Sequence, residues 1–165
     1  MNGYLHSFYP IRFSDCDPFR HLNNAKYIDY FLNAREDQLK QAYDLGLADF
    51  YKRGIGWVIM THEIFYVRPA SHGETICIRT GLLDAGPEHL LVEMIMLDEQ
   101  QRQLKSLLHT RFVPISLTDG KKQPHSDEFL EFLRDKIIPG LDGNIPSATH
   151  RVQYWQQQLK LATVK

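Results

Sequence analysis

The feature that most constrains the fold of this chain is a switch in hydrophobic period. From Asn24 to Leu45 the apolar residues recur at helical spacing, with Asn23 or Asn24 as the cap and Gly46 as the stop. A helix over this segment has about 20 residues and is roughly 30 Å long. The segments before and after it alternate or run apolar in the way that strands do. The sequence therefore predicts one long helix packed against a sheet.

Five segments have the pattern of strands. In the first, Tyr9, Ile11 and Phe13 share one face, and Pro10 between them indicates an edge strand because proline cannot donate to a neighbouring strand. The other four follow the helix and are joined by turn-forming segments, residues 69–73 among them, short enough to favour antiparallel neighbours. They are Trp57 to Val67, Thr75 to Leu83, His89 to Leu97 and Leu104 to Leu117. This order predicts an α+β fold, with the long helix on a five-stranded antiparallel sheet.

The end of the chain differs from the rest in composition. A short helix is predicted from Ser126 to Lys136, before Pro139 and Gly140, so we expect a domain over residues 1–139 and a tail over residues 140–165. In the tail, helical spacing predicts a small amphipathic helix that is capped near Ser147 and cannot bury its apolar stripe alone. The stripe consists of Val152, Trp155, Leu159 and Ala162.

The predicted sheet has surfaces that one long helix does not cover. A single helix packs on one face only, and the unpaired backbone groups of an edge strand invite pairing with another subunit. We therefore expect a homodimer or a homotetramer, and the sequence does not distinguish the two.

Composition and missing motifs exclude several classes of protein. With 19 basic and 20 acidic residues the formal net charge is -1, which gives no general attraction to nucleic acid or to an anionic membrane. The apolar stretches are far shorter than the roughly 20 residues of a membrane span, and the first residues do not resemble a secretory signal. We therefore expect a cytoplasmic protein. Cys16 and Cys77 stand alone, without the spacing of a disulfide framework or a zinc site.

The segment from Arg12 to Tyr27 carries the groups best suited to chemistry. It joins the first strand to the long helix and places polar side chains beside the helix N-terminus. There, unsatisfied amides and the positive end of the helix dipole can bind a developing oxyanion, and a nearby carboxylate can activate water or attack directly. The same residues also suit a simple turn and a helix cap. Residue chemistry alone leaves both interpretations open.

Four motifs lie in or near this segment: Asp15-Cys16-Asp17-Pro18, His21-Leu22-Asn23-Asn24, Tyr27 and Asn33-Ala34-Arg35. A second, weaker block runs from Ile64 to Ala70 and is followed by Gly73. With these motifs the sequence resembles a known family, the hot-dog-fold acyl-CoA thioesterases, and especially the 4-hydroxybenzoyl-CoA thioesterase-like group. In element order the resemblance covers about residues 5–118.

The resemblance implies catalytic roles at Asp17 and at the start of the long helix near Asn24. Asp17 matches the family's catalytic carboxylate and would act as nucleophile or general base toward the thioester carbonyl. The oxyanion donor would be a backbone amide at or near Asn24. Of the pair Asn23 and Asn24, one orients water or substrate and the other caps the helix. His21 matches a common histidine position, and Arg20 stands where glycine is common, which puts the shape of the substrate loop in doubt.

Other polar residues near these motifs have two interpretations each. Asp15 is a turn-stabilising carboxylate or, if it faces Asp17, a like charge that raises the pKa of Asp17. Arg35, within the apolar stripe of the long helix, is a structural residue that neutralises Asp15 or a carboxylate of a partner chain, or it contacts a ligand. Cys16 has no basic partner in the sequence and is not expected to be a nucleophile.

The predicted substrate contacts lie on the helix and on the second strand. An acyl or aryl pocket between helix and sheet could be lined by Tyr27, Tyr30, Phe31, Trp57 and Met60, although core packing explains most of them without a ligand. His62 is in phase with Met60 and Ile64 and faces the pocket or the subunit interface, or it is a hydrogen-bonded structural histidine. The candidate site thus contains Asp17 and Asn24 as catalytic groups, with His21, Asn23, Tyr27, Met60 and His62 as substrate contacts.

The leading hypothesis is a thioesterase that converts an acyl thioester of coenzyme A or acyl carrier protein into a carboxylic acid and a thiol. It requires no metal and no redox cofactor. A hydratase or dehydratase on the same fold, or an acyl-thioester-binding protein without activity, are the alternatives. The HExxH, GxSxG, GxGxxG and P-loop motifs are missing, which excludes zincin, serine-hydrolase and nucleotide-binding folds. The acyl group is not specified.

Overall fold

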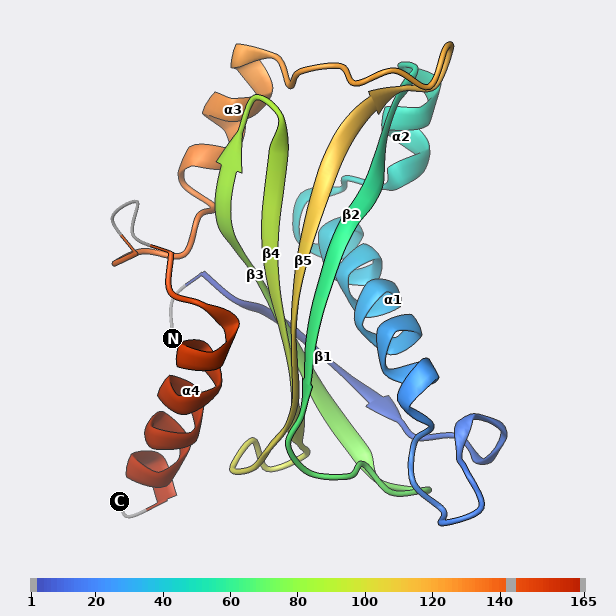
Figure 1. Ribbon diagram of the computed structural model, residues 1–165, viewed down its shortest axis with the longest axis vertical. Coiled ribbons are helices and arrows are strands. Elements are labelled where there is room, and N and C mark those ends of the chain that lie inside the picture. The colour runs from blue at the N-terminus through green and yellow to red at the C-terminus, as the bar shows by residue number, and fades with distance from the viewer. Residues whose placement is uncertain (1–2, 142–144, 164–165) are drawn as a thin grey trace.

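The computed structural model describes residues 3–141 and 145–163 (Figure 1). Residues 1–2 of the predicted domain, and residues 142–144 and 164–165 of the predicted tail, lie outside these ranges. The first half of the chain forms β1 (Leu5–Pro10), the 3-10 turn η1 (Phe13–Asp15), α1 (Asn24–Tyr43), α2 (Leu47–Lys52) and β2 (Ile55–Tyr66). The second half forms β3 (Thr75–Gly86), β4 (His89–Asp98), β5 (Leu104–Ser116), α3 (Asp127–Arg134) and α4 (Ala148–Thr163).

The strands form one five-stranded antiparallel sheet in the order β1-β3-β4-β5-β2. The predicted α+β class and the edge position of the first strand are confirmed. The segment 69–73 does not join neighbouring strands as expected, because β1 lies beside β3 and β2 pairs with β5 instead. β1 and β2 are therefore the two edges of the sheet.

The first strand is shorter at its C-terminal end than the alternation predicts. The amide of Ile11 still donates to Glu74, after which the chain turns into η1. Phe13, expected on the strand, begins that turn and is 80% exposed. The prediction that Phe13 shares a strand face with Tyr9 and Ile11 is wrong, because Pro10 ends the ladder.

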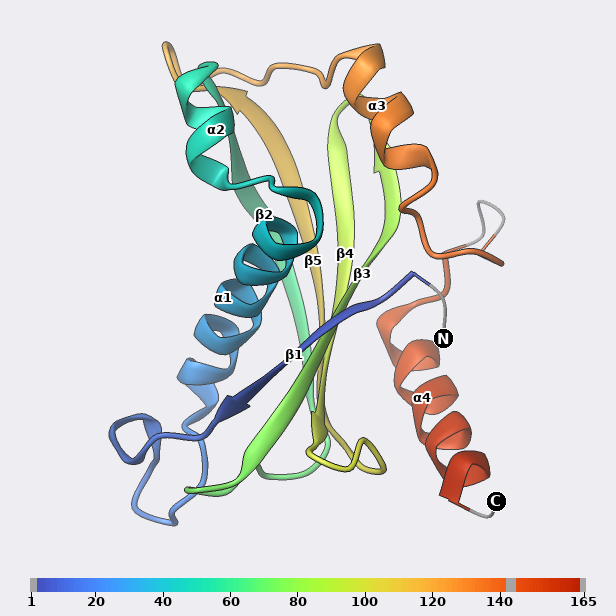
Figure 2. The same ribbon diagram turned by 180° about the vertical axis from the view of Figure 1, so that it is seen from behind.

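Helices cover both faces of the sheet. Figures 1 and 2 show α1 and α4 on opposite sides of it. The residues of β4 alternate between two cores: Met94 and Met96 pack with Phe31 of α1, whereas Ile95 and Leu97 pack with Trp155 of α4. A central strand that is buried on both sides reads as a nearly continuous apolar run, as β4 does.

The long helix begins as predicted and ends two residues early. Asn23 is its N-cap, and Asp44, in the left-handed conformation with φ 53°, is its C-cap. Gly46, the predicted stop, is instead the N-cap of α2, a short helix that the sequence pattern did not predict. α2 brings Phe50 onto Trp57 of β2, with ring centroids 4.8 Å apart.

The tail helix is confirmed, with Trp155 and Leu159 buried against the sheet and Ala162 exposed. Its start is tied by Ser147, whose hydroxyl accepts the amide of His150. The division at residue 139 stays a prediction. Over residues 3–141 and 145–163, no helix combines the length and the apolar character that crossing a membrane requires.

Candidate active site

The loop between η1 and α1 is a small hairpin. Cys16 and Leu22 form an antiparallel bridge, the amide of Asp17 donates to the carbonyl of His21 at 2.8 Å, and the amide of Asn23 donates to Asp15 at 2.9 Å. These backbone bonds place Asp17 and His21 opposite each other and lead the chain directly into α1.

One of the two carboxylate oxygens of Asp17 accepts hydrogen bonds from its own loop. Its Oδ1 accepts the amides of Phe19 at 2.9 Å and His21 at 3.1 Å. Its Oδ2 accepts no hydrogen bond within the described part of the chain. Arg20, between these donors, has φ 64°, a left-handed conformation that costs a residue other than glycine about 1 kcal/mol. The loop thus has the backbone conformation that glycine favours although arginine occupies the position.

The N-terminus of α1 leaves one amide free. Asn23 accepts the amide of Ala25 with its side chain at 2.9 Å and the amide of Lys26 with its carbonyl at 2.7 Å. The amide of Asn24 has no partner among the residues that the structure describes. The hydroxyl of Tyr66 donates to the carbonyl of Asn24 at 3.0 Å and ties the helix to the end of β2. Asn23 therefore is the capping member of the pair.

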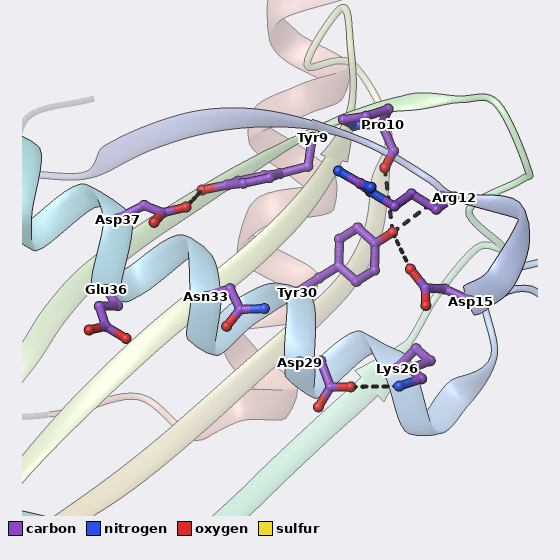
Figure 3. A pocket seen from close by; sticks show the side chains of 10 residues that line it. All are labelled: Tyr9, Pro10, Arg12, Asp15, Lys26, Asp29, Tyr30, Asn33, Glu36 and Asp37. Atoms are coloured by element: carbon purple, nitrogen blue, oxygen red, sulfur yellow. Dashed lines mark hydrogen bonds and ion pairs between the residues drawn. The ribbon is translucent and has the colours of Figure 1, made fainter.

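Asp15 is one of the residues that line a polar cleft beside α1 (Figure 3). The cleft has a volume of about 430 Å³ and lies between β1 and the outer side of the helix. There the Tyr30 hydroxyl donates to Asp15 at 2.9 Å, and Lys26 pairs with Asp29 at 3.1 Å. Neither Asp17 nor Asn24 lines this cleft. Asp15 therefore has the turn-stabilising role that was one of its two interpretations.

The neighbouring thiol is poorly suited to attack. Burial and the charges of Asp15 and Asp17 raise the pKa of Cys16, and its sulfur is bound to the carbonyl of Arg12 at 3.3 Å. A raised pKa disfavours the reactive thiolate.

The remaining predicted contacts are spread over two regions. Tyr27 is 2% exposed, its hydroxyl accepts the amide of Ala70 at 3.1 Å, and its ring packs edge-on against Tyr66. Met60 is 57% exposed and lies at a bulge of β2, so the alternation that linked it to His62 is interrupted there. His62 is hydrogen-bonded to Thr110 at 2.9 Å, and burial lowers its pKa.

The structure contains a second cavity between helix and sheet, where an acyl pocket was predicted, and of the residues predicted for that pocket Trp57 lines it. It has a volume of about 300 Å³ and an apolar wall, and it lies between the C-terminal half of α1, α2, α3 and the sheet. None of the seven predicted site residues lines it. Much of the wall is aromatic, from segments far apart in sequence: Tyr43, Phe50, Trp57, Phe112, Phe129 and Phe132.

Comparisons with solved structures find the same architecture. An oleoyl thioesterase (putative) from Lactobacillus plantarum has a TM-score of 0.72 and 20% identity over 78% of this chain and 49% of that protein, so this chain spans about half of its length. The probable thioesterase YbaW from Escherichia coli has a TM-score of 0.70 and 22% identity, over 81% and 99%. A DHNA-CoA thioesterase from Staphylococcus aureus has a TM-score of 0.72 and 15% identity, over 94% of both chains.

Sequence comparison identifies the family. No curated protein matches the chain. The profile of the thioesterase-like superfamily matches residues 11–133, which include the hairpin loop, α1 and all strands after β1. The chain therefore belongs to the thioesterase-like superfamily and has the hot-dog fold, a long helix packed against a five-stranded antiparallel sheet.

Proposed function

We propose that the protein hydrolyses an acyl thioester of coenzyme A or of acyl carrier protein to a carboxylic acid and a free thiol. The observation that carries this proposal is that two groups have no partner in the described chain: Oδ2 of Asp17 on the hairpin loop, and the amide of Asn24, the first residue of α1. Membership of the thioesterase-like superfamily supports thioester hydrolysis as the general activity. The proposed compartment is the cytoplasm.

In the proposed reaction Asp17 supplies the carboxylate. As a nucleophile it adds to the thioester carbonyl, expels the thiolate and leaves a mixed anhydride that water hydrolyses. As a general base it takes a proton from water while the water oxygen adds to the carbonyl; the tetrahedral intermediate then breaks its C–S bond, and the thiolate leaves with the proton that Asp17 took. In both routes the oxyanion is stabilised by the amide of Asn24 and the positive end of the α1 dipole. Asn23 holds this amide in position through the cap.

The amide of His21 fixes the Asp17 carboxylate, and its side chain lies on the same loop. We propose the His21 side chain, and the Nδ2 group of Asn23 whose Oδ1 forms the cap, as contacts for the carrier side of the thioester. Tyr27 contributes to the site indirectly. Its ring packs against Tyr66, whose hydroxyl donates to the carbonyl of Asn24.

A homodimer through β2 would complete the site. β1 is short and ends at Pro10, whereas the outer edge of β2 is twelve residues long and carries the exposed side chains of Val58, Ile59 and Met60. When two copies of a strand pair antiparallel, the end of each lies beside the start of the other. The Tyr66 end of one copy, with Asn24, would then lie near the Trp57 end of the other and its apolar cavity. Met60 and His62 would lie along this interface.

The test is release of thiol from short, long and aromatic acyl-CoA thioesters, and from acyl carrier protein thioesters, by native protein, Asp17→Asn and the control Asp44→Asn. We expect selective release by the native protein and the control, and a loss of about a hundredfold or more in Asp17→Asn. Consumption of an enoyl thioester without thiol release would instead indicate a hydratase. Thermal stabilisation by these thioesters without turnover would indicate a binding protein.

A further inference from the structure

The apolar cavity contains a cation that the proposed chemistry does not use. Arg35 lies on α1 among residues that face the sheet: Phe31, Ala34 and Gln38 are all buried. Its Nη1 donates to Oγ1 of Thr80 on β3 at 3.1 Å. The guanidinium therefore lies between helix and sheet, in the wall of the cavity.

The hydrogen bond of Arg35 leads to neutral groups only. The hydroxyl of Thr80 donates to Oε1 of Gln38 at 2.6 Å, and Nε2 of Gln38 donates to Ser7 and to the carbonyl of Ile78. A guanidinium has five N–H donors, and this chain of contacts takes one of them. The rest of the planar fork has no partner within residues 3–141 and 145–163.

Within the part of the chain that the structure describes, no neighbouring acid neutralises the charge of Arg35. No carboxylate of the described residues forms an ion pair with it, and Asp15, one of its predicted partners, is bound to Tyr30 instead. That prediction is wrong because Asp15 lines the polar cleft, whereas Arg35 lines the apolar cavity. Burial lowers the pKa of Arg35 to about 10, which leaves the side chain charged at neutral pH.

Two other cations, one in the cavity wall and one on the far face of the sheet, are each paired with an acid. Lys136, also in the cavity wall, pairs with Asp135 at 2.8 Å, and Arg151 on the other face of the sheet pairs with Glu93 at 2.8 Å. Glu36, the acidic residue of the wall, is exposed and forms no ion pair with Arg35 in the described chain. Arg35 is half-buried, and a charge that has lost part of its hydration without gaining a counter-charge is costly, a cost that a ligand anion would remove.

We propose that this cavity takes the far end of the acyl group and that Arg35 pairs there with a carboxylate, so that the substrates are thioesters of dicarboxylic acids. A guanidinium matches a carboxylate with two parallel hydrogen bonds, while Leu32, Phe112 and Phe129 contact the methylene chain. A volume of about 300 Å³ is at the small end of ligand cavities, which favours chains of medium length. The assignment of substrate class rests on the proposed thioesterase activity.

The test compares suberyl-CoA with octanoyl-CoA, which have the same chain length and differ in the terminal carboxylate. We expect the native protein to favour suberyl-CoA in kcat/KM by about tenfold or more, and Arg35→Met to lose this preference because its kcat/KM falls by about that factor more for suberyl-CoA than for octanoyl-CoA. Arg35→Lys retains the charge without the fork and should keep part of the preference. Arg134→Met, which removes an exposed arginine of α3, should keep all of it.

A binding measurement separates this proposal from the catalytic one. In Asp17→Asn, suberyl-CoA should raise Tm more than octanoyl-CoA does, and adding Arg35→Met should abolish the difference. This result would stand even if neither thioester were hydrolysed. Equal stabilisation by the two ligands, no native preference in kcat/KM, or an equal loss for both substrates in Arg35→Met would overturn the proposal, because a purely structural arginine affects both substrates alike.

Discussion

Two carboxylates of this protein have opposite environments. Glu93, on β4, is 0% exposed and accepts hydrogen bonds on both oxygens. Asp17, on the hairpin loop, is half-buried and has one oxygen without a partner in the described chain. The donors to Glu93 are Tyr4, His109, Arg151 and Trp155.

The difference shows how the same functional group is used for stability in one region and left available for chemistry in the other. Burial alone would raise the pKa of Glu93, but hydrogen bonds from Arg151 and His109 and the charge of Arg151 outweigh it and lower the pKa to about 2. A carboxylate whose lone pairs are all engaged holds α4 on the sheet and cannot attack a carbonyl. Asp17 has the free oxygen that such an attack needs.

The largest effect on stability is expected from Glu93→Gln. It leaves the guanidinium of Arg151 buried without its counter-charge, which should lower the free energy of unfolding by about 3–5 kcal/mol. Urea unfolding measures this, with Glu88→Gln on the β3–β4 turn as an exposed control. An unchanged urea midpoint for Glu93→Gln would contradict the claim that the Glu93 carboxylate stabilises the fold.

Lowering the pH should show how much the ionised Glu93 carboxylate contributes to the free energy of unfolding of the native protein. The pKa of Glu93 is lower in the folded chain than its ordinary value of 4.5, so its contribution is complete above that pH and is lost as the pH falls toward about 2. We expect it to amount to about 3 kcal/mol, measured by urea unfolding across this range. Glu93→Gln should show a correspondingly shallower loss, and parallel curves for the two proteins would contradict the assignment.

At the loop, a smaller effect is expected from Asn23→Ala. Loss of the cap should lower the free energy of unfolding by about 1 kcal/mol and reduce thiol release, because the cap places the amide of Asn24. Ser147→Ala removes the equivalent contact of α4 and should cost similar stability without affecting activity. Equal rates of thiol release in Asn23→Ala and Ser147→Ala would contradict a role of the Asn23 cap in catalysis.

The smallest effect is expected from Arg20→Gly. Glycine removes the left-handed strain but gains freedom in the unfolded chain, so stability should rise by about 0.5 kcal/mol. Thermal unfolding checks this, with Gln101→Gly, at another left-handed position, as the reference. A decrease in Tm at position 20 alone would mean that the Arg20 side chain stabilises the loop.

Local patterns predicted the parts of the fold that depend on neighbours in sequence. The helical period identified α1, and the Asn-Asn pair identified its cap, because both arise within a few residues. The position of Arg35 within the apolar stripe was also read correctly. Its lack of a carboxylate partner was not predictable, since it depends on which side of the helix Asp15 reaches.

Features that depend on distant pairing were missed. Glu93 reads as one polar residue in an apolar strand, and two of its donors, Tyr4 and Arg151, are 89 and 58 residues away. The pairing of β2 with β5, and the aromatic wall that α2 and α3 add to the cavity, likewise bring together segments without a shared local signal. One sequence feature did indicate a distant contact: the apolar stripe of the tail helix, which cannot be buried unless the helix packs on another surface.

The most direct test of the account is kcat/KM for thiol release per mole of folded protein, measured with urea unfolding on the same samples of native protein, Asp17→Asn and Glu93→Gln. Asparagine keeps an oxygen that can accept the loop amides, so Asp17→Asn should lose about a hundredfold or more in kcat/KM while its free energy of unfolding changes by less than about 1 kcal/mol. Glu93→Gln should show the reverse. Native kcat/KM in Asp17→Asn would contradict the account.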